Sequence, residues 1–205
     1  MNLQPGTETK ICLLILFGIK RQFSWTQHVS TPVKKHYSLF LLFNLDRKTK
    51  RLALAGQLCG ATLLLTLLSI PLPSGYGYVN LGDAGVFLCA CLLPGGLGAL
   101  AAGLGAALAD LILGWAIYAP VTLVIKGLTA LLAGLALWRV KKFGLPLCLL
   151  CCLMVPLGYF LYETILLTAP VAAVNILPNA LQAAVGACLG TLVGRHLKAI
   201  FIRKN

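Results

Sequence analysis

Long apolar runs recur from Leu52 to the C-terminus, and they constrain the fold of this 205-residue chain more than any other feature. Several approach the roughly 20 residues that a helix needs to cross about 30 Å of hydrocarbon. Hydrophobic residues make up 59% of the chain and charged residues only 11%, far below the charged share of an average soluble domain. The runs are too many for a single anchor or a signal peptide. We therefore expect an all-α integral membrane protein.

Proline, glycine and basic residues divide these runs into six predicted transmembrane helices. The helices cover about residues 52–70, 82–93, 97–113, 120–138, 145–167 and 172–195. The breaks contain Pro71, Pro94, Gly114 and Pro170, and proline does not continue a helix because it lacks a backbone N–H. No extended soluble domain remains, because only the first 50 residues and short loops lie outside the runs.

The net charge of +12 raises the alternative of a nucleic-acid partner, but its placement argues against one. From residue 47 onward, every Lys and Arg except Lys126 falls in one of three clusters: 47–51, 139–142 and 195–204. Basic clusters beside apolar helices mark the cytoplasmic side of a membrane protein. We therefore expect both termini in the cytoplasm (N-in/C-in) and no nucleic-acid partner. The loops 71–82, 114–119 and 168–171 would then face outward from a bacterial plasma membrane.

The predicted organisation is a basic extension over residues 1–50, a six-helix membrane domain over 51–198 and a cytoplasmic tail over 199–205. The extension is read as surface-associated, disordered or the result of a misassigned translation start. The eight cysteines lie mainly in apolar runs without His or carboxylate partners at ligand spacing. We expect them to be buried hydrophobes, with no metal site and no cofactor.

Small residues recur every four positions on three predicted helices, where they allow close helix contact in lipid. Gly186, Gly190 and Gly194, and the stripe that starts at Gly98, are expected to pack inside the bundle. The pair Gly56 and Gly60 on the first helix has an alternative role considered below.

Polar and ionisable residues gather in the outer halves of the predicted helices. Such groups are costly in a membrane and are candidates for function. They are Asp83, Asp110, Lys126, Tyr159, Glu163, Asn175, Asn179 and Gln182. The segregation favours one shared, outward-opening pocket over scattered interhelical hydrogen bonds. With three carboxylates and one lysine, the pocket suits a neutral or cationic ligand.

Each of these residues also has a structural interpretation. Asp83 is a preferred helix cap, and Lys126 could form an ion pair with Asp110 or Glu163. Asn175 and Asn179 flank Pro178 and could satisfy backbone groups that the proline leaves unpaired.

Motifs for catalysis and nucleotide binding are absent. The sequence contains no GxxxxGK[ST], HExxH or GxSxG pattern. Gly82-Asp83 is similar to the GxGD of intramembrane aspartyl proteases, but position 80 is Asn rather than Gly. We therefore predict a non-catalytic protein.

Four segments together carry a family resemblance. They are YVNLGDA (78–84), ALADLILG (107–114), YAPVTLVIKGLTALLAG (118–134) and NILPNALQAAVGACLG (175–190). Over about residues 50–198 the chain resembles the substrate-binding S-components of energy-coupling factor (ECF) vitamin transporters. It is most similar to the riboflavin-type branch, which also includes pyridoxine and hydroxymethylpyrimidine carriers.

The resemblance implies a six-helix S-component bundle that captures a small vitamin from outside. It implies docking onto a transmembrane coupling subunit that bears two ATPase subunits, which hydrolyse the ATP. Family members dock through small residues on the first helix, here Ala53, Gly56 and Gly60 in place of the usual AxxxA.

The resemblance also implies roles in the pocket. Asn80 and Asp83 would lie on the loop that closes it, with Lys126, Asn175 and Asn179 at its walls. Aromatic neighbours suited to stacking a heteroaromatic ring are Tyr76, Tyr78, Trp115, Tyr118 and Tyr159. Two other classes stay open: a stand-alone secondary transporter of a small polar or cationic solute, and, more weakly, an intramembrane aspartyl enzyme.

Overall fold

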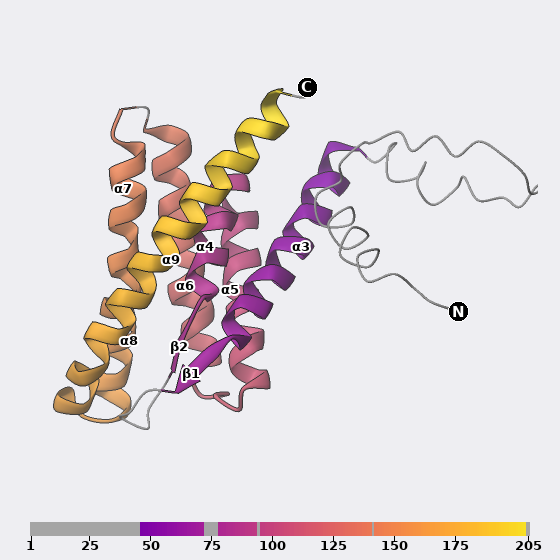
Figure 1. Ribbon diagram of the computed structural model, residues 1–205. Helices are drawn as coiled ribbons and strands as arrows, with labels where there is room; N and C mark the ends of the chain where they lie inside the picture. The colour runs from indigo at the N-terminus through magenta and orange to yellow at the C-terminus, as the bar shows by residue number, and fades with distance from the viewer. Residues whose placement is uncertain (1–45, 72–77, 94, 141, 204–205) are drawn as a thin grey trace, which may run out of the picture. The chain divides into compact units, whose positions relative to one another are not determined.

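The computed structural model describes residues 46–71, 78–93, 95–140 and 142–203, with side chains as far as Ala199 (Figure 1). The part from Arg47 onward forms one compact helical unit. Its elements are α3 (Arg47–Leu67), β1 (Ser69–Pro71), β2 (Tyr78–Asn80), α4 (Gly82–Leu92), α5 (Gly96–Ile112), α6 (Ala119–Arg139), α7 (Gly144–Leu150), the 3-10 turn η1 (Cys151–Leu153), α8 (Met154–Leu166) and α9 (Ala169–Arg203). Most of the predicted 1–50 extension, and Tyr76, lie outside the described residues.

The helical fold class is confirmed, since helical segments occupy all six predicted positions. Among the described residues, three helices are long and apolar enough to cross a membrane: Ala119–Arg139, Gly144–Leu166 and Ala169–Ala199. Helices α4 and α5 are apolar but shorter. The outward faces carry large exposed hydrophobics such as Leu104, Leu161 and Ile165, as expected of a surface that contacts lipid.

The β1–β2 pair was not predicted, because residues 71–82 were expected to form a loop. The two strands are antiparallel, with Ser69 opposite Asn80 and Pro71 opposite Tyr78. A residue that precedes proline is disfavoured in the helical region, so Pro71 pushes Ile70 toward an extended conformation. Helix α3 therefore ends at Leu67 rather than at Ile70, and the returning strand leads directly into α4.

The fifth predicted helix is not continuous. A 3-10 turn, Cys151–Leu153, separates α7 from α8, and Pro156 lies in the first turn of α8. Pro156 has no N–H for the carbonyl four residues earlier, and its ring crowds that carbonyl. The helix tightens at this position for that reason.

Helix α4 lies at the centre of the bundle. It contacts α3, α5, α6 and α9, and eight of its 11 residues are buried. Eleven helical residues span only about 16 Å, about half of a hydrocarbon layer. The first turn of α4 is inside the bundle, because Asp83 is 0% exposed and paired with Lys126 on α6, rather than at an outer helix end as the sequence pattern had put it.

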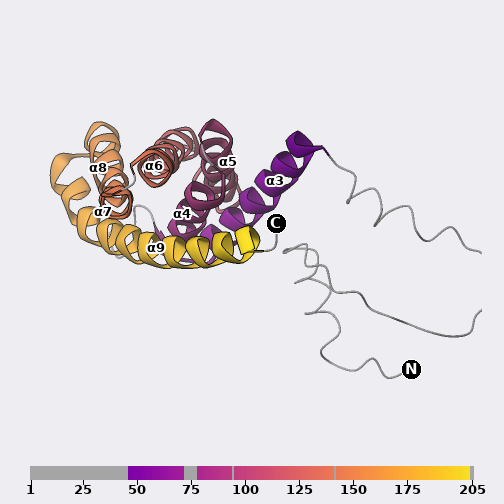
Figure 2. The same cartoon turned by 90° about the horizontal axis from the view of Figure 1, so that it is seen from above.

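Close packing between α4 and α9 depends on the glycines of α9, as predicted. A Cβ on Gly190 would meet the carbonyl oxygen of Ala84 and lie 2.9 Å from Phe87 Cβ. A Cβ on Gly186 would meet the side chain of Asp83. Seen from above, α9 runs along one side of the bundle past α4 and α8 (Figure 2). The α9 backbone is thereby brought close to the start of α4.

The two ends of the bundle differ in charge. The start of α3, the end of α6 and the last turns of α9 lie at one end, so the basic clusters gather there (Figure 1). The β1–β2 pair and the α5–α6 and α8–α9 connections lie at the other end. The connection after α5 turns at Gly114, whose φ of 84° favours glycine.

Candidate functional site

A cavity opens at the end of the bundle opposite the basic clusters. It has about 450 Å³ of space free of protein atoms, a figure that includes open solvent. It is lined by Thr66, Tyr78, Asn80, Ala106, Asp110, Trp115, Tyr118, Thr122, Lys126, Tyr159, Glu163, Asn179 and Gln182. Strand β2 and helices α3, α5, α6, α8 and α9 all contribute to this wall.

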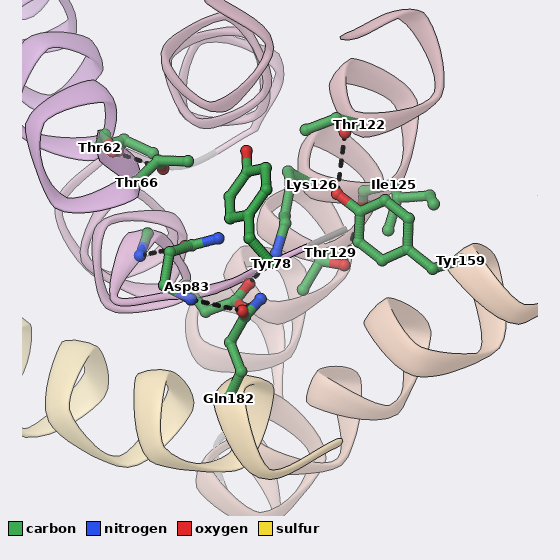
Figure 3. A network of polar contacts seen from close by, with 12 residues as sticks. Thr62, Thr66, Tyr78, Asp83, Thr122, Ile125, Lys126, Thr129, Tyr159 and Gln182 are labelled. Carbon is green, nitrogen blue, oxygen red and sulfur yellow. Dashed lines mark hydrogen bonds and ion pairs between the residues drawn. The ribbon is translucent and has the colours of Figure 1, made fainter. Parts of the chain in front are cut away.

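A buried ion pair forms the floor of the site. Lys126 Nζ donates to Asp83 Oδ1 at 2.6 Å, and the two side chains are only 4% and 0% exposed. Gln182 Nε2 donates to Asp83 Oδ2 at 2.8 Å. Figure 3 shows Lys126 from α6 and Gln182 from α9 converging on Asp83. The ion-pair interpretation of Lys126 was right in kind, but its partner is Asp83 rather than Asp110 or Glu163.

Asn80 connects β2, α4 and α9. Its Oδ1 accepts a hydrogen bond from Gly82 N at 2.6 Å, and its backbone N donates to Gln182 Oε1 at 2.7 Å. A short polar side chain that binds the backbone two residues ahead is a common way to start a helix. Both Asp83 oxygens are already bound by side chains, and the N-cap residue Leu81 makes no side-chain cap bond. The predicted capping role of Asp83 is therefore wrong, and Asn80 satisfies the start of α4.

Asp110, near the end of α5, forms the second polar group of the wall. Tyr78 from β2 donates its hydroxyl to Asp110 Oδ1. Burial, and then the nearby Asp110 carboxylate, raise the pKa of Tyr78 well above its usual range, so the phenol stays protonated and donates. The other oxygen, Asp110 Oδ2, is buried and has no hydrogen-bond partner in the described residues.

Glu163 on α8 forms a third group. Asn175 Nδ2 donates to Glu163 Oε2 at 3.0 Å, and the Tyr118 hydroxyl lies 3.5 Å from Glu163 Oε1. Asn175 is 1% exposed and does not line the cavity, so it orients Glu163 from behind. Asn179, one turn further along α9, reaches the cavity itself.

Aromatic rings form part of the cavity wall. The centroid of the Trp115 ring lies 5.8 Å from that of Tyr118 and 6.2 Å from that of Tyr78. Tyr159 lies 6.4 Å from Tyr118, and its hydroxyl is 2.9 Å from Thr122 Oγ1. These tilted and edge-on pairs are ordinary aromatic packing, and they leave apolar ring surface at the cavity.

The cavity wall includes most of the predicted site residues. Eight of them line it directly: Asn80, Asp110, Tyr118, Lys126, Tyr159, Glu163, Asn179 and Gln182. Asp83 and Asn175 lie behind the wall, bound to residues that line it. The pattern missed Thr66 and Thr122, because threonines are common in apolar helices and carry no charge to draw attention. Their position within one turn of an outer helix end was the available signal.

The small residues of α3 lie on a different surface. Ala53 and Gly56 are exposed, and a Cβ added to Gly56 or Gly60 would meet no atom within 4 Å. The glycines of α9 behave in the opposite way, since their Cβ positions are filled by α4. Among the described residues, no other segment therefore packs closely against Gly56 and Gly60 of α3.

An apolar helical bundle with a cavity of polar and aromatic residues at one end is typical of a helical membrane protein with a candidate binding site. Residues 46–199 match the family described as "ECF-type riboflavin transporter, S component". The chain belongs to this family, so it is a substrate-binding component of a transporter rather than an enzyme. A similar protein from Pyrococcus woesei, described as an uncharacterized protein in the gap 3'region, is 33% identical over 139 residues, which cover 67% of this chain and 93% of that protein.

Proposed function

We propose that this chain is the substrate-capture subunit of an ATP-driven ECF importer in the cell membrane. It would bind a small heteroaromatic vitamin or precursor, such as pyridoxine, hydroxymethylpyrimidine or riboflavin. The observation that carries the proposal is the cavity at the end opposite the basic clusters, whose wall combines polar groups with aromatic rings. Flat heterocycles suit such a site because rings stack while polar edges bond to fixed partners.

The proposed orientation follows from charge. The described basic residues other than Lys126 lie at one end of the bundle, and such residues favour the cytoplasmic side. The cavity then faces outward, with both termini of the membrane domain inside and six crossings of the membrane. In this arrangement the cavity is open to solutes from outside the cell.

Each proposed site residue has a part in this scheme. Asp110, Glu163, Asn179 and the aromatic residues contact the ligand from the wall. Asp83 positions Lys126, because the carboxylate holds Nζ at 2.6 Å. The hydrogen bond between Asn80 and Gln182 joins β2 to α9. It would therefore hold the β2 residues that contact the ligand in a fixed position relative to α9.

The exposed face of α3 is the proposed docking surface for the coupling subunit. Ala53, Gly56 and Gly60 offer a strip without large side chains, which allows a partner helix to approach closely in lipid. The coupling subunit would carry two ATPase subunits that supply the energy for release of the ligand inward.

Two experiments test the proposal. Calorimetric titration of the purified protein with pyridoxine, hydroxymethylpyrimidine and riboflavin should give binding of at least one. Vesicles that contain the protein, a coupling subunit and both ATPases should then accumulate that ligand only with ATP inside. Uptake by the protein alone would instead identify a secondary transporter.

An aspartyl enzyme is disfavoured because both oxygens of Asp83 are bound by Lys126 and Gln182.

A further inference from the structure

The buried oxygen Oδ2 of Asp110 is the least satisfied polar atom of the described site. Asp110 is 2% exposed and lines the cavity. Its Oδ1 accepts from Tyr78, but no group in the described residues meets hydrogen-bond geometry with Oδ2. The hydroxyl of Thr122 lies close to Asp110, but it is bound to the Tyr159 hydroxyl at 2.9 Å. Buried polar atoms in native proteins are nearly always paired, and an unpaired one needs an explanation. A ligand that donates a hydrogen bond supplies one here.

The charge around this oxygen favours a positive or strongly polarised donor. The site holds the carboxyl groups of Asp83, Asp110 and Glu163, against the single ammonium group of Lys126. That ammonium is 2.6 Å from Asp83 Oδ1, so its charge is already balanced. The described wall contains no other Lys, Arg or His. A phosphate or carboxylate ligand would therefore meet two carboxyl groups without a cation to offset them.

The shape of the wall selects a flat ring. Trp115 lies between Tyr78 and Tyr118, with centroid separations of 6.2 and 5.8 Å. Tyr78 links the aromatic wall to the carboxyl group of Asp110, because its ring packs near Trp115 and its hydroxyl binds Asp110. A ring that packs on these aromatics can therefore direct its edge to Asp110. Aromatic faces also favour electron-poor or cationic partners.

We infer that the site selects an unphosphorylated nitrogen heterocycle that presents an amino or cationic ring N–H to Asp110 Oδ2. The inference rests on the proposed function and narrows its substrate class. Asp110 is the specificity-determining residue, and Tyr78 positions it by occupying Oδ1. Ligands that lack this N–H donor leave Oδ2 unpaired, and phosphate esters are repelled.

The test uses two probes that differ in one group. They are 4-amino-5-hydroxymethyl-2-methylpyrimidine and the same molecule with hydrogen in place of the amino group. Calorimetry on the purified full chain should show tighter binding of the amino probe by roughly tenfold to a hundredfold, the usual effect of a hydrogen bond to a charged group. Asp110→Asn should reduce this preference at least tenfold.

Matched variants separate this contact from general effects. Glu163→Gln removes the same charge from the same wall, but its oxygens already face Asn175 and Tyr118. It should weaken both probes alike and keep the amino preference. Thr164→Val changes a hydroxyl that bonds to its own helix at Phe160 O, 2.7 Å away, and should change neither probe. Tyr78→Phe removes the bond that positions Asp110 and frees Oδ1, so it should reduce the amino preference. An unchanged preference in Tyr78→Phe would overturn the inference, which covers the case in which Asp110→Asn does not fold.

Each outcome decides the inference. Equal binding of both probes by the unmodified chain, or a preference that survives in Asp110→Asn, overturns it while leaving the proposed function intact. The inference is also overturned if pyridoxal phosphate binds more tightly than the amino probe, or if riboflavin binds and the amino probe does not. If neither pyrimidine, pyridoxine nor riboflavin binds, the proposed function fails, and the inference falls with it.

Discussion

The buried ion pair between Lys126 and Asp83 gives the sharpest prediction about stability. Lys126→Met keeps the length and most of the volume of the side chain but removes its charge. Asp83 then remains as a carboxylate with 0% exposure and only Gln182 as a partner. Breaking one side of a buried pair costs about 3–5 kcal/mol. For a chain of this size, that loss lowers Tm by on the order of 10 °C.

The double variant Asp83→Asn/Lys126→Met tests the cause of that loss. With both charges gone, the amide oxygen introduced at position 83 can still accept from Gln182, so most of the lost stability should return. Replacement of a whole buried pair by neutral groups is often close to neutral. Fluorescence-detected size-exclusion chromatography after heating measures Tm for both variants in detergent. Lys142→Met, at an exposed position, should stay within about 0.5 kcal/mol of the unmodified chain.

The reasoning is refuted if Lys126→Met melts within about 2 °C of the unmodified chain, since the charge left on Asp83 would then cost almost nothing. It is also refuted if the double variant is no more stable than Lys126→Met. In that case Lys126 would stabilise the bundle through packing rather than charge.

Two further predictions concern binding and docking. Asn179→Ala should weaken binding of the ligand roughly tenfold while membrane insertion stays normal, because one polar contact in the wall is lost; unchanged affinity would remove Asn179 from the site. Gly60→Leu should abolish ATP-dependent uptake but spare binding, because its Cβ position is open and outside the cavity. Gly190→Leu should instead prevent correct folding, because its Cβ would meet the carbonyl of Ala84. Normal uptake by Gly60→Leu, or loss of binding, would exclude this face of α3 as the docking surface.

Lys126 illustrates how far the sequence could predict the site. Its position inside an apolar helix marked it as functional. The ion-pair hypothesis named Asp110 and Glu163 as partners and left out the third carboxylate, Asp83. The choice among them depends on where α4 begins relative to α6, because Asp83 is 43 residues away along the chain. The predicted depth of Asp83 assumed that α4 reaches the outer end of the bundle, whereas α4 begins after the β1–β2 pair. No local pattern reports that offset.

The polar interpretations of Asn80 and Asp83 show the same limit. Both residues lie at the start of one helix, and both types are good caps. Only the orientation of α4 toward α6 and α9 decides that Asp83 turns inward to Lys126 and Gln182. Asn80 is then left to bind Gly82 N. The sequence pattern placed both residues in the right region but assigned the cap to Asp83, whereas Asn80 binds the start of α4 and also lines the cavity.

By itself the sequence determined a helical membrane protein with polar groups gathered near one end and basic clusters at the other. Hydropathy, proline breaks and charge clusters are local properties, so they can be read along the chain. Only the tertiary structure decided which polar groups pair across helices and which glycines pack against a neighbouring helix. Two results of the packing are that Asp110 Oδ2 has no partner among the described residues and that the Cβ positions of Gly56 and Gly60 on α3 stay open. Both depend on the relative depth and rotation of helices that are far apart in the sequence.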